Sequence, residues 1–137
     1  MGRHHRALAA AAPLAAALAL AACGGSDKPG YCADRSNLEQ SVKDVGDVQA
    51  IKSGGVSELK ARLQKVETNA RTLAGSAKSD FPSQTNAITS AVSTLKTSVQ
   101  GLPSHPSAQQ LAVVAANGQT LVKSVQAFTT ATKDKCS

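Results

Sequence analysis

Apolar residues recur at alternating steps of three and four along most of the chain after position 55. Such steps place side chains on one face of an α-helix, and a narrow apolar face is typical of helices that pack side by side in a bundle. Three seams have this spacing: Val56, Leu59, Leu63, Val66, Ala70, Leu73 and Ala77; Ile88, Val92, Leu95, Val99 and Leu102; and Leu111, Val114, Gly118, Leu121, Val125, Phe128 and Thr132. The pattern therefore predicts three long helices.

A shorter and less regular apolar pattern precedes them, at Leu38, Val42 and Val45 and then at Val48 and Ile51. It predicts a fourth helix, and leaves open whether residues 47–52 are helical, irregular or extended. Local boundary signals support this division. Two capping boxes, Ser36 with Glu39 and Ser107 with Gln110, mark helix starts, and Pro82 is suited to a first turn. The breaks between helices are marked by Gly46, Ser53-Gly54-Gly55, Gly75 and Gly101-Leu102-Pro103.

Asn117-Gly118 is the one boundary signal that contradicts the apolar spacing. This dipeptide usually marks a turn. The steps of three and four nevertheless continue in phase on both sides of it. We therefore predict a single helix, with the small Gly118 at a close helix contact, and leave open whether the helix bends there.

The first residues have the layout of an export signal. A basic start, Met1 to Arg6, is followed by the almost wholly apolar Ala7 to Ala22, which is shorter than the roughly 20 residues of a membrane span. Leu20-Ala21-Ala22-Cys23 then resembles the lipobox of bacterial lipoproteins. That resemblance implies cleavage before Cys23, lipid on its sulfur, and a location on the outer face of the cell membrane.

The chain is thus predicted to have three parts: a signal peptide at 1–22, a lipidated cysteine and flexible Gly- and Pro-rich tether at 23–31, and a helical domain at 32–137. In composition and layout it resembles small Ala-, Ser- and Thr-rich helical lipoproteins of high-GC Gram-positive bacteria. This resemblance implies no functional residues.

With Cys23 lipidated, Cys32 and Cys136 remain as a pair in an exported chain, which favours a structural disulfide. No adjacent basic cluster favours reactive thiols, and two cysteines with one distant histidine do not complete a metal site. An up-down bundle with an even number of helices brings both chain ends to one side, as the disulfide requires. The sequence therefore predicts an all-α, up-down bundle of about four helices.

Charge and composition argue against nucleic-acid binding. Removal of Arg3 and Arg6 leaves thirteen basic against nine acidic residues, a net charge of +4 without a basic block, and there is no tryptophan, one tyrosine and two phenylalanines. A nucleic-acid interface normally clusters basic residues and interleaves aromatics. We expect no nucleic-acid binding, and only a weak preference for anionic lipid or cell-wall polymer.

Candidate chemical sites are few. Gly54-Gly55 lacks the remainder of a phosphate-binding motif, so we interpret it as a loop between helices. His105 is expected in an exposed loop, Asp44 and Asp47 as hydrated carboxylates, and Glu58–Arg62 and Glu67–Arg71 as surface pairs. We expect no catalytic residues, no metal and no cofactor.

The leading expectation is a non-enzymatic helical interaction or scaffold module at the cell envelope, with an unknown protein or polymer partner. The alternative is a carrier that binds an apolar or lipid-like ligand between its helices. A cavity between the helices would favour the carrier, whereas a filled core with an exposed apolar stripe would favour the interaction module.

Overall fold

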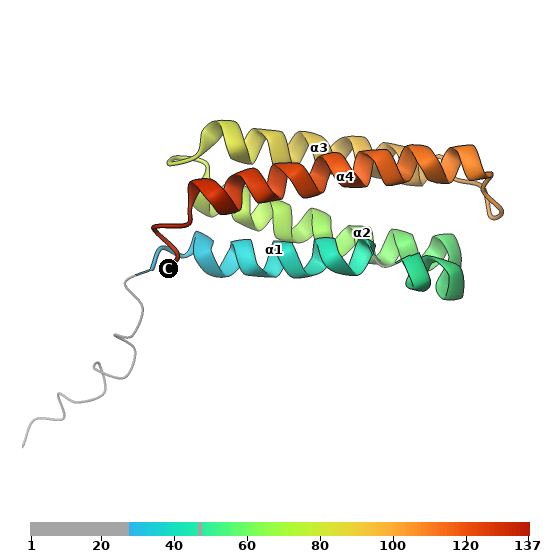
Figure 1. Ribbon diagram of the computed structural model, residues 1–137, viewed down its shortest axis with the longest axis horizontal. Coiled ribbons are helices and arrows are strands. Elements are labelled where there is room, and N and C mark those ends of the chain that lie inside the picture. The colour runs from blue at the N-terminus through green and yellow to red at the C-terminus, as the bar shows by residue number, and fades with distance from the viewer. Residues whose placement is uncertain (1–27, 47) are drawn as a thin grey trace, which may run out of the picture.

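The structure is a computed structural model that describes residues 28–46 and 48–137, and the side chains of residues 28–46 and 55–137. Within these residues the helices are α1 (Tyr31–Gly46), α2 (Val48–Ala77), α3 (Pro82–Gln100) and α4 (Ala108–Ala131). Successive helices run in opposite directions, and the start of α1 and the end of the chain lie at the same end of the bundle (Figure 1). The predicted all-α, up-down bundle is confirmed.

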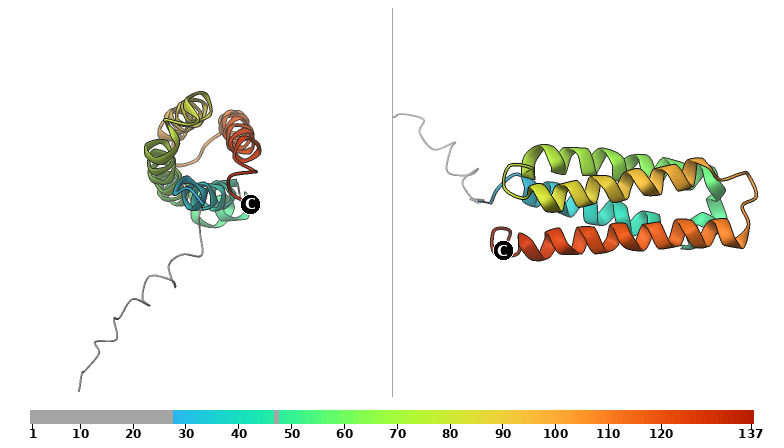
Figure 2. Two further views of the ribbon diagram at one scale, coloured as in Figure 1. Left: turned by 90° about the vertical axis from the view of Figure 1, so that its left-hand side faces the viewer. Right: turned by 90° about the horizontal axis from the view of Figure 1, so that it is seen from above.

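The predicted seams form the core. Seen end-on, the helices surround a common axis in chain order (Figure 2). The buried seam residues are Leu59, Leu63, Val66, Ala70, Leu73 and Ala77 on α2, Ile88, Val92, Leu95 and Val99 on α3, Leu102 after it, Val114, Leu121, Val125 and Phe128 on α4, and Thr132 after it. Tyr31, Leu38 and Val42 of α1 and Ala91 of α3 also belong to this core.

Two local predictions of helix ends are confirmed. Ser107 accepts a hydrogen bond from the Gln110 backbone N–H at 3.1 Å, and the Gln110 side chain accepts one from the Ser107 N–H at 2.8 Å. Pro82 lies in the first turn of α3, where its missing N–H costs no helical hydrogen bond. These signals act through neighbouring residues only, which is why the sequence displays them.

The predicted start of α1 is wrong. The helix begins at Tyr31, five residues before the predicted capping residue Ser36, and the Cys32 N–H donates to the Pro29 carbonyl at 3.0 Å. Tyr31 is buried although it ends the predicted tether. The first turn is held by its packing and by a distant cysteine, so a local capping motif could not locate it.

The region left open by the sequence is helical from Val48 onward, while Asp47 lies outside the described residues. A break at Gly55, with φ of +67°, separates this stretch from the long part of α2. Left-handed backbone of this kind is accessible to glycine at little cost. The break therefore lets the chain change direction between α1 and the straight part of α2.

Glu67 of α2 forms the predicted pair with Arg71 and, beyond the prediction, also links α2 to α3. Its carboxylate accepts a hydrogen bond from Lys96 Nζ of α3 at 3.0 Å and also pairs with Arg71. The hydrogen bond from Lys96 and the nearby positive charges, opposed by burial, hold the pKa of Glu67 below the ordinary glutamate value of 4.5.

Glu67→Gln should therefore have a pH-dependent effect on stability. Because the folded-state pKa is below the unfolded one, the stabilisation is present above the unfolded pKa and is lost as pH falls through the folded pKa. Urea unfolding should show the variant less stable than wild type at neutral pH and equal to it in acid. Glu58→Gln, in the pair with Arg62 on α2, is the matched control. A stability difference that persists unchanged into acid would contradict this account.

Candidate functional site

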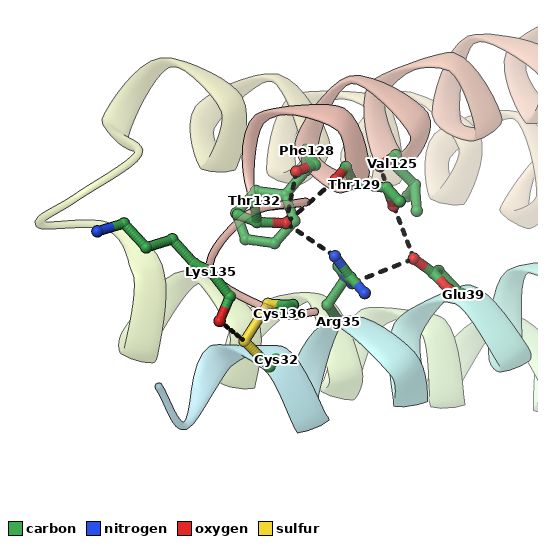
Figure 3. Close-up of polar contacts among 9 residues, drawn as sticks. All are labelled: Cys32, Arg35, Glu39, Val125, Phe128, Thr129, Thr132, Lys135 and Cys136. Atoms are coloured by element: carbon green, nitrogen blue, oxygen red, sulfur yellow. Dashed lines mark hydrogen bonds and ion pairs between the residues drawn. A yellow bond between two sulfur atoms is a disulfide. The ribbon is translucent and has the colours of Figure 1, made fainter. Parts of the chain in front are cut away.

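The disulfide predicted between Cys32 and Cys136 is present, with a Cα–Cα distance of 5.4 Å. It joins the first turn of α1 to the segment that follows α4, at the end of the bundle where the described chain begins (Figure 3). This bridge fixes which two helices meet at that end.

An aromatic cluster lies in the core at the start of α1. Tyr31, Phe81 and Phe128 make edge-to-face pairs, with ring centroids 5.6 to 6.2 Å apart. Such pairs add stabilisation beyond the burial of their area. Since these three are all the aromatic residues of the chain, no aromatic side chain remains to form an exposed anchor for a partner.

A polar clasp, formed by Arg35, Glu39, Thr129 and Thr132, joins α1 to the end of α4 (Figure 3). Arg35 Nη1 donates to Thr132 Oγ1 at 3.1 Å, and Thr129 Oγ1 donates to Glu39 Oε1 at 2.6 Å. Arg35 Nε lies 3.4 Å from the same Glu39 oxygen, an ion pair rather than a hydrogen bond. The buried hydroxyl of Thr132 donates in turn to the Phe128 carbonyl at 2.8 Å.

Beyond the clasp, α1 and α4 separate to leave a groove of about 730 Å³, which we call the α1–α4 groove. Its apolar floor consists of Val42, Val122 and Val125. The other lining residues are Glu39, Lys43 and Gly46 of α1 and Gln126, Thr129 and Thr130 of α4. Its polar residues gather toward the clasp, while its far end is formed by Gly46 and Val122.

The prediction that Gly118 lies at a close helix contact is wrong. A Cβ placed there would meet no atom of the described residues within 4 Å, and the same holds for Gly46. Gly118 precedes Val122 by one helical turn and therefore shares its face of α4. The predicted continuity of the helix through Asn117-Gly118 is confirmed. The glycine thus lies one turn beyond Val122, the last residue of α4 that lines the groove, and no described side chain packs closely on it.

Two further seam positions differ from the prediction. Leu111 is 37% exposed and Val56 is only half-buried, although both continue the apolar spacing. Periodicity identifies the face of a helix, but it cannot show whether a neighbouring helix extends far enough to cover each turn of that face.

The remaining candidate residues are not brought together. His105 lies in the exposed connection between α3 and α4, as predicted, and Asp44 is exposed on α1. The backbone carbonyl of Asp44 accepts a hydrogen bond from Arg62 Nη1 at 2.7 Å. Asp47 and the predicted lipidation residue Cys23 lie outside the described residues.

Sequence reasoning missed the clasp and the groove. The spacing of Arg35 and Glu39, four apart, was a visible signal of a helical ion pair. Their partners Thr129 and Thr132 are ninety or more residues away, so only the folded chain shows that the pair joins two helices.

Comparison with known proteins adds no assignment. No helix among the described residues is long and apolar enough to cross a membrane, and the same residues contain no group of three or more metal-binding side chains. No protein-family model, curated protein or solved structure matches the chain.

Proposed function

We propose that this protein is an exported lipoprotein, anchored to the membrane through Cys23, whose helical domain is a non-enzymatic carrier for an apolar, lipid-like ligand. The observation that carries the proposal is the α1–α4 groove, whose volume of about 730 Å³ and valine floor suit a small apolar ligand. The placement also fits: seven residues lie between Cys23 and Tyr31, so the anchor lies eight steps, at most roughly 28 Å, along the chain from the start of α1.

The exposed apolar residues of α4 favour a second candidate, the interaction module. Leu111, Val113 and Val122 are each more than a third exposed. Leu111 and Val122 share one face of α4, but Val113, the most exposed of the three, lies about 200° around the helix from Leu111 and is not part of that stripe. Aromatic side chains are common anchors of protein interfaces, and the aromatic residues of this chain are clustered with one another inside the bundle. We therefore place the carrier first.

A fluorescent fatty-acid probe tests the carrier. The chain from residue 24 onward contains the whole described core, and we expect it to bind a dansyl-labelled fatty acid saturably. Val122→Glu should weaken binding at least about tenfold, because a carboxylate would replace part of the apolar floor.

Val113→Glu is the matched control, since it makes the same change at a more exposed position on another face of the same helix. It should bind the probe as wild type does. Absence of saturable binding to the wild-type chain, or equal losses in the two variants, would overturn the carrier.

A further inference from the structure

Resting on the proposed carrier function, we propose that the α1–α4 groove binds one long-chain carboxylate in a fixed direction, with its head group at the clasp and its tail passing over Gly118 toward Leu111. The source is a free fatty acid rather than the acyl chains attached to Cys23. Three observations support this: the order of polar and apolar residues, the charge at the clasp, and the open space at two glycines.

The polarity of the groove sets the direction. Glu39 of α1 is hydrogen-bonded to Thr129 of α4. Gln126 and Thr130, within one turn of Thr129 on α4, also line this end of the groove. Going away from the clasp, α4 presents Val125, Val122, Gly118, Ala115 and Leu111 on the same face, none of them polar. A tail directed at the clasp would bury hydroxyl and charged groups without compensation, which is costly.

Charge complementarity selects an anionic head. Glu39 and Lys43 are the charged residues that line the groove; Glu39 pairs with Arg35 of the clasp, whereas Lys43 has no ion-pair partner among the described residues. A carboxylate at this end would interact with the cations and accept hydrogen bonds from Thr130 or Gln126. A cationic head group would find only the carboxylate of Glu39 among the lining residues, and that carboxylate already pairs with Arg35.

The two glycines leave room for a long tail. Gly46 lines the far end of the groove and Gly118 lies one helical turn beyond Val122; among the described residues, a Cβ on either would meet nothing within 4 Å. At about 1.5 Å of helix rise per residue, Gly118 lies roughly 16 Å from Thr129 along α4. A zigzag chain of C–C bonds advances about 1.3 Å per carbon, so octanoate spans roughly 10 Å and palmitate roughly 20 Å. Only palmitate would pass Gly118.

Gly118→Leu tests this placement. The leucine side chain leans toward the N-terminus of α4 and would fill the tail path beyond the valines. It replaces glycine by a better helix former in open space, so the fold should be retained, as circular dichroism can verify. In displacement of the dansyl probe, we expect palmitate to lose about tenfold or more in affinity and octanoate to be unchanged.

Ala116→Leu, at an exposed position on the opposite side of α4, should alter neither ligand. Equal effects of Gly118→Leu on octanoate and palmitate, or no effect on either, would overturn the tail placement while leaving the carrier function standing. Failure of palmitate to displace the probe from wild type would instead count against the carrier itself.

The head group is tested separately with hexadecylamine, which has a similar chain and a cationic head. Wild type should bind palmitate at least about tenfold more tightly than this amine. Equal or tighter binding of the amine would overturn the anionic assignment. Arg35→Gln should remove most of the difference if the clasp supplies the charge.

Discussion

Reduction of the Cys32–Cys136 disulfide should lower the thermal unfolding midpoint by about 8 °C or more while leaving most of the helix intact at low temperature. The bridge spans a sequence separation of 104 residues. For a closed loop of that size the chain-entropy model gives roughly 4–5 kcal/mol, and even half of this would produce the stated shift in a domain of about 100 residues. That is a large share of the stability of a small domain.

The packing explains why helical content should survive. α1 packs mainly against α2, and α4 mainly against α3, whereas α1 and α4 contact each other least. The clasp and the disulfide both lie at one end of that weakest contact. Loss of the bridge therefore removes a constraint on the unfolded chain without removing the apolar seams that hold each helix pair together.

Circular dichroism of the chain from residue 24, with and without reductant, measures both quantities. Mass spectrometry should find no free thiol in the untreated protein and two after reduction. The Cys32→Ser/Cys136→Ser variant is the control, because reductant should not shift its midpoint. Two free thiols in the untreated folded protein would contradict the pairing.

The seams show how far the sequence alone determines this fold. Burial on one face imposes a spacing of three and four, so Leu63, Val92 and Leu121 could be assigned to the core without coordinates. The cap at Ser107 could be assigned because its partner Gln110 is three residues away. Both signals are local in sequence, and both are correct.

The candidate site depends on quantities that no local pattern contains. The groove exists because α1 and α4 separate beyond the clasp, between residues that are some eighty to ninety positions apart in the sequence. Gly118 illustrates the difference: its place in the apolar spacing was correct, but among the described residues the expected close neighbour is missing. A glycine on an apolar face is compatible with either close packing or empty space.

Cys23→Ala in the full precursor should abolish lipid attachment and release the protein from the membrane fraction. Only a cysteine thiol can take the lipid that the lipobox specifies, and Leu20-Ala21-Ala22 precedes this cysteine alone. Stable anchoring requires two acyl chains, and the apolar segment from Ala7 to Ala22 is short for a membrane span. The loss should therefore be complete rather than partial.

Metabolic labelling with an alkyne fatty acid, followed by membrane fractionation, measures this loss. The Cys32→Ser/Cys136→Ser variant is again the informative control, because it removes two of the three cysteines and should keep both the label and the membrane location. Since Cys32 and Cys136 are joined to each other, neither thiol is free to accept lipid in the folded domain. Label that persists in Cys23→Ala would contradict the lipoprotein assignment. It would also remove the reason to place the bundle, with its α1–α4 groove, beside a membrane.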